Sequence, residues 1–250
     1  MSTTVKHKLI IFFRKVWRIL FNLNFVITFL VLYPLFYIFI LSDKTWGIVF
    51  LLKRFWANLI LLDAGITYHV KRESKLAGKG TYIFCANHTS YLDTVAMYAA
   101  MPHYFHFIGK AELTKIPLFR IFFWKMDIPV NRGSTIAAHK AFSRAASDLK
   151  KGISISIFPE GTIHDNAPKL NRFKNGPFKM AIESQVPIVP VTFKNNWIIL
   201  PEGRKGKKGG KPTRMEVVIH KPIPTKGMTE NNIEALKAQV FAIINNELRK

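Results

Sequence analysis

The sequence predicts an α/β fold, in which a mixed, largely parallel sheet is flanked by helices and preceded by an N-terminal pair of membrane-associated helices. Two observations support this fold class. From residue 64 onward, short apolar runs alternate with longer segments of helical pattern, which is typical of a sheet covered by helices. Before that point, two long apolar stretches contain few charges. We therefore expect a membrane-anchoring helical segment over residues 1–62 and a separate domain over residues 63–250.

The first apolar stretch has the length of a membrane-spanning helix. No charged side chain occurs between Arg18 and Asp43. As an α-helix, the 24 intervening residues would extend about 36 Å, enough to cross a hydrocarbon core of about 30 Å. A buried core helix is the alternative. The second stretch, residues 46–62, is interrupted by Lys53 and Arg54, which predicts an interfacial helix whose cations reach the lipid headgroups.

The distribution of charge favours a chain that returns to one side of the membrane. Residues 1–18 contain five basic side chains and no acidic one, and residues 63–250 contain 29 basic and 14 acidic side chains, a net charge of +15. Because basic flanks remain on the cytoplasmic side, we expect both flanks there. The helices are therefore predicted to form a hairpin or an in-plane pair at the cell membrane, with the larger domain on its cytoplasmic side.

The whole chain is both basic and apolar, and these two properties together indicate which kind of partner it binds. Its formal net charge is +22 over 250 residues, and 49% of its residues are hydrophobic. An anionic membrane satisfies both properties, whereas nucleic acid satisfies only the first, so we expect the membrane and no nucleic acid as a partner. The single cysteine, Cys85, excludes an intramolecular disulfide and a CxxC-type zinc site.

After residue 64, the pattern predicts seven strands and five helices. Alternation of apolar and polar residues around Tyr68 indicates a first strand with one covered face. The expected strands are residues 66–70, 81–86, 104–108, 128–130, 153–158, 188–193 and 215–220. The expected helices are residues 91–101, 117–124, 134–151, 177–184 and 229–248. Residues 203–212, with five cations and four glycines, predict a flexible exposed loop.

The segment NHTSYLD, residues 87–93, follows a predicted strand and begins a predicted helix, where α/β sheets present reactive groups. Across such a turn, Asp93 could return to the ring of His88, fix its tautomer and stabilise its protonated form. His88 could then deprotonate a substrate alcohol. The first alternative is a helix capping box, in which Asp93 satisfies an N–H group at the helix end. The second makes Cys85 a nucleophile with His88 as its base, although apolar neighbours predict a buried, inert thiol.

A second segment of interest, FPEGT at residues 158–162, directly follows an apolar strand. Pro159 and Gly161 are compatible with a simple turn. Glu160, however, stands at the carboxyl end of a buried strand, where a carboxylate has a desolvation cost and usually has a partner or a substrate. Glu160 is therefore a further candidate functional residue.

Together these segments resemble the phospholipid/glycerol acyltransferase family, and especially its 1-acyl-sn-glycerol-3-phosphate acyltransferases. The defining motifs of that family, NHxxxxD and PEGT, are present as NHTSYLD and FPEGT. Two further blocks agree in order: DIPVNR, which contains Arg132, and VPIVPV at residues 186–191. FKNG, residues 173–176, resembles the run that lies between PEGT and the VPI block. The resemblance covers roughly residues 60–225, and N-terminal membrane helices are also usual in the family.

The resemblance implies an acyltransferase catalytic domain over residues 63–250. It would move a fatty acyl group from an acyl thioester to the free hydroxyl of 1-acyl-sn-glycerol-3-phosphate, giving phosphatidic acid in phospholipid biosynthesis. His88 would deprotonate the hydroxyl, and Asp93 would orient and stabilise the imidazole. Acyl-carrier protein or acyl-CoA would be the donor and a lysophospholipid the acceptor, and the resemblance implies no cofactor and no metal.

The resemblance also implies an acceptor site. Glu160, Gly161 and Thr162 would shape this site. Arg132 and Lys110 would hold the acceptor phosphate. The guanidinium group of an arginine is well suited to this role, because it can bind two phosphate oxygens at once. The alternative for Lys110 is an ordinary solvated lysine.

One departure from the family pattern affects the acceptor. Ile163 follows EGT, where many members with phosphate-bearing acceptors have arginine. Either Arg172 or Lys169 supplies that charge, or the acceptor is another lysolipid, such as a lyso-aminolipid. The non-enzyme alternative is a basic, membrane-tethered binding module. His103 and His106 could pair on a metal, but strand geometry would place them on opposite faces, which predicts structural histidines.

Overall fold

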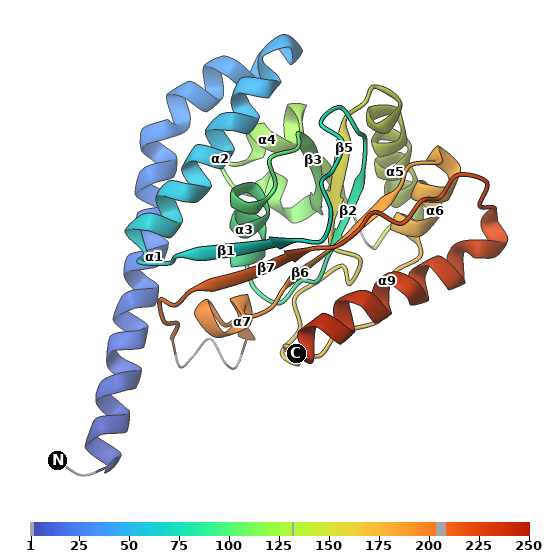
Figure 1. Cartoon of the computed structure of the whole chain (residues 1–250). Helices are drawn as coiled ribbons and strands as arrows, with labels where there is room; N and C mark the ends of the chain where they lie inside the picture. The colour runs from blue at the N-terminus through green and yellow to red at the C-terminus, as the bar shows by residue number, and fades with distance from the viewer. Residues whose placement is uncertain (1–2, 132, 204–208) are drawn as a thin grey trace.

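Seven strands form a single sheet in the computed structural model, which describes residues 3–131, 133–203 and 209–250 (Figure 1). Their order is β1-β7-β6-β2-β5-β3-β4, and all neighbours are parallel except the antiparallel pair β6 and β7. The strands are β1 (Tyr68–Arg72), β2 (Ile83–Ala86), β3 (Phe105–Lys110), β4 (Ile128–Val130), β5 (Ser154–Ile157), β6 (Ile188–Phe193) and β7 (Met215–Ile219). The predicted mixed, largely parallel sheet is confirmed.

Helices cover both faces of this sheet, which explains why every residue of its central strands β6, β2 and β5 is buried. Within β2, Phe84 and Ala86 belong to the apolar cluster of one face, and Ile83 and Cys85 to that of the other. On the first face lie α3 (Leu92–Ala100), α4 (Arg120–Lys125) and the N-terminal helices, and on the second lie α5 (Thr135–Lys150), α6 (Gly176–Ser184) and α9 (Ile233–Leu248). Short helical turns complete the described elements: η1 (Asp43–Thr45), η2 (Ala111–Lys115), α7 (Asn196–Ile199) and η3 (Glu230–Asn232).

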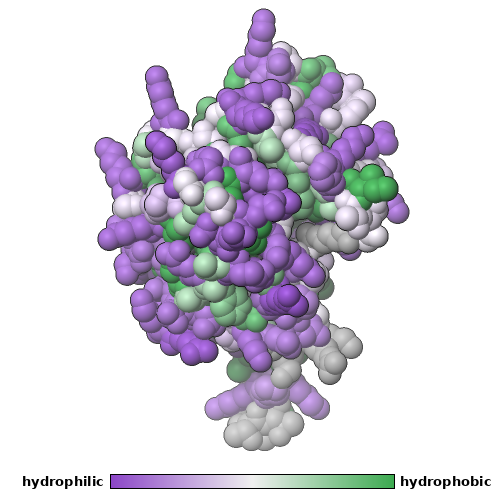
Figure 2. Space-filling view, turned by 90° about the vertical axis from the view of Figure 1, so that its right-hand side faces the viewer, coloured by the Kyte–Doolittle hydropathy of each residue, from purple (hydrophilic) through white to green (hydrophobic). Residues whose placement is uncertain are grey.

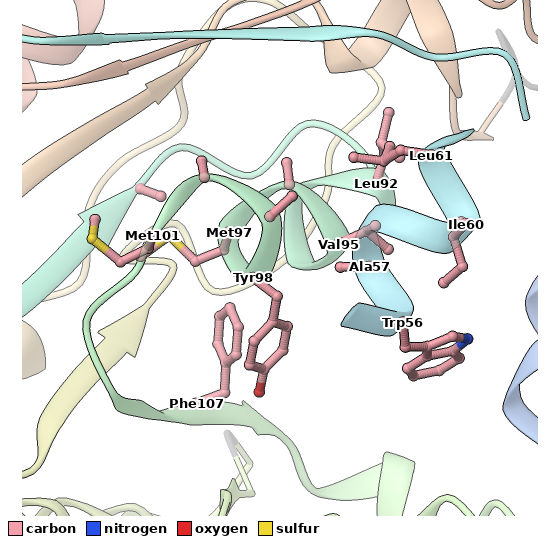
Figure 3. Close-up of a cluster of buried hydrophobic side chains, with 14 of the residues drawn as sticks. Trp56, Ala57, Ile60, Leu61, Leu92, Val95, Met97, Tyr98, Met101 and Phe107 are labelled. Atoms are coloured by element: carbon pink, nitrogen blue, oxygen red, sulfur yellow. The ribbon is translucent and has the colours of Figure 1, made fainter. Parts of the chain in front are cut away.

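The first two helices form an antiparallel hairpin along one side of the domain (Figure 1). α1 spans Thr3–Ile40 and α2 spans Trp46–Asp63, and both are long and apolar enough to cross a membrane. α2 packs along α3, with Ala57 and Leu61 in the same buried cluster as Val95 and Leu92 (Figure 3). The predicted pair of N-terminal helices is therefore present, and one side of it is buried against the domain.

The opposite side of the hairpin is apolar and exposed, in contrast to the far side of the domain. Large apolar side chains are exposed along both helices, including Leu20, Leu23, Ile27, Val31, Leu35 and Ile38 of α1 and Leu51, Phe55 and Leu62 of α2. The face turned away from the hairpin is mostly hydrophilic (Figure 2). A continuous apolar face of this kind is typical of contact with a membrane.

The prediction that Lys53 reaches the lipid headgroups is wrong. Its side chain points into the protein, where Lys53 is 3% exposed and its Nζ lies 2.7 Å from Oδ2 of Asp127. The ammonium also lies 4.4 Å from the centre of the Phe122 ring. Helical geometry gives the reason: positions 49, 50, 56 and 57 are buried, and residues three and four apart share a face with position 53. The neighbouring Arg54 donates from Nε to the carbonyl of Tyr98 at 3.2 Å.

The expected covered face of the first strand is also largely wrong. β1 is an edge strand that pairs only with β7, and Val70 is its only half-buried residue among four exposed ones. Ile66, which the alternation placed in the strand, lies before it and is buried. An edge strand has a neighbour on one side only, and this explains its exposure.

Candidate active site

Three chain segments meet at the carboxyl edge of the parallel part of the sheet. Residues 87–91 connect β2 to α3, residues 158–162 follow β5, and α7 (Asn196–Ile199) follows β6. Because β2 lies between β5 and β6 in the sheet, the ends of these strands bring the three segments together. This edge is where open α/β sheets bind their ligands.

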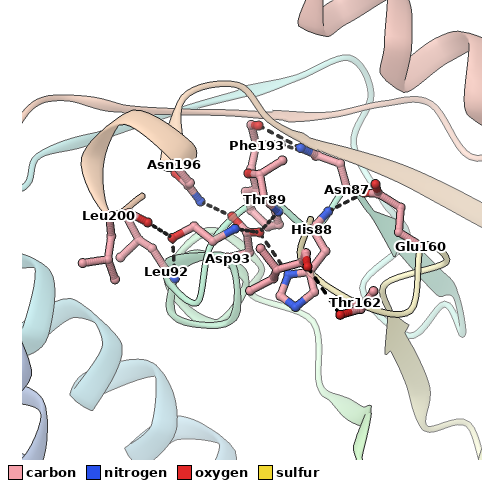
Figure 4. Close-up of polar contacts among 12 residues, drawn as sticks. Asn87, His88, Thr89, Leu92, Asp93, Glu160, Thr162, Phe193, Asn196 and Leu200 are labelled. Carbon is pink, nitrogen blue, oxygen red and sulfur yellow. Dashed lines mark hydrogen bonds and ion pairs between the residues drawn. The ribbon is translucent and has the colours of Figure 1, made fainter. Parts of the chain in front are cut away.

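His88 and Asp93 form a hydrogen-bonded pair in this group (Figure 4). Nδ1 of His88 lies 3.1 Å from Oδ2 of Asp93. Asp93 is fully buried, whereas the His88 side chain is 14% exposed. Within the described part of the chain, Nε2 of His88 has no hydrogen-bond partner. With Nδ1 donating to the carboxylate, the lone pair of Nε2 is the free basic position of the neutral ring.

The capping interpretation of Asp93 also holds. Its Oδ2 accepts hydrogen bonds from the backbone N–H groups of Thr89 at 2.6 Å and Ser90 at 2.9 Å. The same carboxylate therefore fixes the turn that begins α3 and the tautomer of His88. The two interpretations of the motif describe one arrangement, since the turn must be rigid for the imidazole to be held in place.

The ring of His88 is further fixed by stacking. It lies parallel to the ring of Phe158, with centres 3.9 Å apart and planes 5° from parallel. Phe158 is itself buried and contacts Phe107, with ring centres 5.6 Å apart. The imidazole is thus held by a carboxylate at Nδ1 and an aromatic ring on one face, and Nε2 stays open.

Glu160 connects the two loops of the site rather than standing free. Its Oε1 accepts from the backbone N–H of His88 at 2.8 Å, and its Oε2 accepts from the backbone N–H of Asn171 at 2.8 Å. Burial raises the pKa of the Glu160 carboxyl, and the hydrogen bonds from Asn171 and His88 oppose that rise. The partner that the sequence argument required for this buried carboxylate is therefore the protein backbone.

The remaining predicted residues lie at different distances from this arrangement. Gly161 has a left-handed φ of +80°, which favours glycine, and its N–H donates to the carbonyl of Phe158 at 3.0 Å. Thr162 is exposed. Lys110 ends β3 as an exposed side chain that pairs with Glu112 at 3.3 Å, as its alternative interpretation expected. Arg132 lies outside the described residues, so its predicted role stays a prediction.

The two candidates that might have replaced an arginine after EGT are both solvent-exposed. Lys169 and Arg172 lie on the segment that follows residues 158–162. Asn171 between them binds Glu160, so this segment is attached to the site.

Cys85 is not placed to act with His88. Its thiol is fully buried and belongs to the apolar cluster on the second face of the sheet, whereas Phe158, on which His88 stacks, belongs to the cluster of the first face. Burial raises the pKa of the thiol far above its ordinary value. Both observations disfavour a thiolate nucleophile.

The two other histidines of interest each bind a different partner within the protein. Nδ1 of His106 lies 2.9 Å from Oδ2 of Asp148, and Nε2 of His103 lies 2.9 Å from the carbonyl oxygen of Ala77. The described residues contain no group of three or more His, Cys, Asp or Glu side chains that could hold a metal ion.

Comparison with known proteins gives the family. Residues 67–194 match the model of the family described as Acyltransferase. The chain belongs to this family. It is 32% identical over 176 residues to the chloroplastic 1-acyl-sn-glycerol-3-phosphate acyltransferase BAT2 of Brassica napus, a match that covers 69% of this chain and 49% of that protein.

Two further relatives extend the comparison of this acyltransferase. It is 29% identical over 189 residues to 1-acyl-sn-glycerol-3-phosphate acyltransferase alpha of Mus musculus, covering 73% of this chain and 65% of the mouse protein. The crystal structure of the 1-acyl-sn-glycerophosphate acyltransferase PlsC from Thermotoga maritima has the same fold, with a TM-score of 0.76 at 23% identity over 94% of this chain and 96% of that one. The chain spans about half to two thirds of the length of these curated relatives.

The sequence argument missed one polar contact of the candidate site. Nδ2 of Asn196 donates to Oδ1 of Asp93 at 2.8 Å, and both side chains are fully buried (Figure 4). Asn196 lies 103 positions further along the chain and two residues beyond the region that matches the family model. No spacing rule connects such distant residues, and the only local signal is an Asn-Asn pair at positions 195 and 196, separated by one residue from the sixth predicted strand.

Proposed function

We propose that this acyltransferase moves a fatty acyl group from an acyl thioester to the free hydroxyl of 1-acyl-sn-glycerol-3-phosphate, giving phosphatidic acid in phospholipid biosynthesis. The observation that supports it most directly is the fixed imidazole of His88, whose Nδ1 is bound to Asp93 and whose Nε2 is open. The names of the relatives supply the substrate class, since both matched proteins are 1-acyl-sn-glycerol-3-phosphate acyltransferases.

In the proposed reaction, His88 acts first as a base and then as an acid. Its Nε2 takes the proton of the acceptor hydroxyl while the hydroxyl oxygen attacks the thioester carbonyl carbon. Asp93 stabilises the imidazolium that forms. The tetrahedral intermediate collapses as the carbon–sulfur bond breaks, and the proton passes from His88 to the departing thiolate. No acyl-enzyme is needed, because the substrate hydroxyl is the nucleophile.

The acceptor site is proposed beside His88. Glu160 fixes the backbone of His88 and of the segment around Asn171, and so shapes the site without touching the substrate. The turn at Gly161 and the exposed Thr162 then border the space next to the imidazole. Arg132 is proposed to hold the acceptor phosphate.

Two further features bear on the acceptor. Lys110 is exposed and already paired with Glu112, so we assign it at most a long-range attraction for the phosphate. Because Ile163 lacks a charge, another lysolipid remains the second candidate acceptor. The donor is proposed to be acyl-CoA or acyl-carrier protein.

The hairpin is proposed to hold the enzyme at the membrane from the cytoplasmic side. One side of α2 is buried against α3, and Lys53 is bound inside the protein, so lipid cannot surround this helix. The exposed apolar side remains available, which favours insertion in the plane of one leaflet over a full crossing. Basic residues at both ends of the hairpin favour the cytoplasmic leaflet.

The substrate proposal is tested with purified protein in detergent micelles containing defined lipids. Lysophosphatidate is offered with acyl-CoA or with acyl-carrier protein charged with the same chain, and the lipid products are identified by mass spectrometry. We expect phosphatidate with at least one donor. Lysophosphatidylethanolamine and lysophosphatidylglycerol serve as competing acceptors. No turnover of lysophosphatidate, or faster turnover of another acceptor, would overturn the assignment of the substrate.

A further inference from the structure

A small cavity lies outside the active site, where α1 contacts the segments that follow β6. Its volume is about 180 Å³. Its lining residues come from α1, α7 and the chain just before β7: Arg14, Trp197, Ile198, Pro201, Gly209, Gly210 and Lys211. We call this cavity the α1 niche. The proposed reaction uses none of these residues.

The α1 niche contains two cations and no acidic side chain in its lining. In the described part of the chain, neither Arg14 nor Lys211 forms an ion pair with an acid. One turn along α1, Arg18 is different, because its guanidinium lies 3.0 Å from the carboxylate of Glu202. The lining therefore has a charge of +2 without an acidic side chain of its own, and this charge is complementary to an anionic group.

The walls of the niche are fixed to α1 by close backbone contacts. Gly210 donates from its N–H to the carbonyl of Arg14 at 3.3 Å. A Cβ atom at Gly209 would lie 2.3 Å from the backbone carbon of Arg14, and one at Gly210 would lie 2.3 Å from the carbonyl oxygen of Ile199. Only glycine fits at both positions. These two glycines, predicted to belong to a flexible exposed loop, are in fact buried.

The niche adjoins a part of α1 with apolar side chains in solvent. Directly before Arg14, Phe12 and Phe13 are 59% and 60% exposed, and Ile10 is half exposed. Within the niche itself, Ile198 is also exposed. A ligand that bridges both features needs an anionic group for the cations and hydrocarbon for the adjoining apolar surface.

We propose that the α1 niche binds the phosphate of an anionic phospholipid, with the acyl chains along the exposed apolar side chains of α1. Arginine and lysine together suit a phosphodiester oxygen pair, and an aromatic residue such as Trp197 suits the interface between headgroup and hydrocarbon. A bilayer lipid is favoured over a free phosphate because the proposed position of the hairpin at the membrane, on which this inference rests, brings this end of α1 to the lipid. The site is separate from the acceptor site at His88.

The test measures lipid binding and no turnover, so it is independent of the proposed reaction. Full-length protein in a neutral detergent is titrated with dioctanoyl phosphatidylglycerol, dioctanoyl phosphatidylcholine and inorganic phosphate, by isothermal titration calorimetry. The variant is Arg14→Gln/Lys211→Gln, because neither side chain forms a hydrogen bond or an ion pair with the described residues. The matched control is Lys8→Gln/Lys15→Gln, which removes the same charge from exposed positions of α1 outside the niche.

We expect the wild-type protein to bind phosphatidylglycerol at least tenfold more tightly than phosphatidylcholine. A cation next to an anionic headgroup changes affinity about fivefold, so the niche variant should lose about thirtyfold, and the control at most about threefold. Equal affinity of niche variant and wild type would overturn the proposal, as would an equal loss in the control. Binding of inorganic phosphate as tight as that of the lipid would also overturn it, because the site would then hold a free anion.

Discussion

Two histidine–aspartate pairs with nearly the same geometry lie at opposite edges of the sheet. His88 and Asp93 stand beyond the carboxyl end of β2, with Nδ1 and Oδ2 3.1 Å apart. His106, near the amino end of β3, and Asp148 of α5 have the same atoms 2.9 Å apart. By distance alone, the second pair is the better one. Only the first pair has a ring nitrogen open to a substrate, so a close histidine–aspartate pair alone does not define the proposed active site.

The difference lies at the other nitrogen of each ring. Nε2 of His106 is 2.8 Å from the hydroxyl oxygen of Tyr104, and the His106 side chain is fully buried. Nε2 of His88 has no such partner among the described residues, and its ring reaches the surface. A histidine can move a substrate proton only if one nitrogen is open to the substrate. Access to Nε2, set by position in the sheet, therefore separates the proposed base, His88, from the structural histidine, His106.

A third pair follows the structural pattern. Nδ1 of His220 lies 3.1 Å from Oε1 of Glu73, and its Nε2 lies 2.9 Å from Oγ1 of Thr192. This ring joins the end of β7 to β6 and to the chain after β1. Both nitrogens are again occupied by protein, as in His106.

The largest expected effect comes from removing each ring in turn. His88→Ala should lower kcat about 10³-fold to 10⁴-fold, because general base catalysis contributes about that much. His106→Ala should leave kcat of the folded enzyme within about threefold, but should destabilise the protein by about 2 kcal/mol or more, because it leaves the Asp148 carboxylate without its buried partner. Steady-state acyl transfer and thermal unfolding in detergent measure the two effects.

The reverse outcome would break the comparison. If His106→Ala abolished turnover in protein shown by circular dichroism to be folded, the second pair would have a role that its burial argues against. If His88→Ala retained activity, the open Nε2 would not be the base.

A smaller effect is expected from Asn196, which touches only the first pair. Asn196→Ala should lower kcat about tenfold to a hundredfold with little change in KM for the acceptor, because a hydrogen bond to a charged group is worth about 1.5–3 kcal/mol. Asn195→Ala is the matched control, since its side chain bonds to the backbone of Arg214 and Glu216 instead. A rise in KM with kcat unchanged would show that Asn196 binds substrate rather than positioning Asp93.

Local features of this site could be predicted from sequence, and distant ones could not. His88 and Asp93 are five positions apart at the junction of a strand and a helix, so the turn geometry alone brings them together. The contact of Asn196 with Asp93 depends on β6 lying beside β2, which no local pattern encodes. For the same reason, the sequence suggested that Glu160 has a partner but did not identify it. The partners are the backbone N–H groups of His88 and Asn171, which lie on two different loops.

The fold shows the same division. β2, β5 and β6 are buried on both faces, and their short runs of apolar and small uncharged residues were sufficient to locate them. Lys53 was misplaced because a hydropathy pattern treats every lysine as exposed, whereas tertiary structure supplies Asp127 from 74 residues away. Such a buried ion pair depends on three-dimensional neighbours, which the local sequence does not contain.

The structural pair can be opened deliberately by Tyr104→Phe, which removes the hydroxyl at Nε2 of His106. We expect a loss of about 1 kcal/mol in the free energy of unfolding, the usual value of one buried hydrogen bond. Turnover by folded protein should not change. In the background of His88→Ala, the same substitution should restore no activity, because His106 stays buried between Trp46 and Asp148. Recovered turnover in the double variant would mean that His106, once its Nε2 is open, can replace His88 as the base despite its different position.

The smallest expected effect is a dependence of the protein's stability on pH, caused by the titration of His220 in its pair with Glu73. Burial lowers the pKa of His220, and Glu73 opposes this by raising it. As the pH falls below the ordinary histidine value of 6.5, the unfolded chain takes up the proton before the folded protein does. The stability contribution of the neutral ring is therefore complete above that pH and decreases as the pH falls towards the lower pKa of the folded state.

His220→Gln should remove this part of the pH dependence, because the amide does not titrate. Unfolding midpoints in detergent from pH 7.5 to 5.5 should fall more steeply for the wild type than for this variant. Glu73→Gln should steepen the fall, since it removes the neighbour that raises the pKa. Parallel curves for all three proteins would contradict the assignment of His220 as a neutral buried ring. In that case, His220 would differ from His88 only in having its Nε2 bound to another protein group, and not in how the ring titrates.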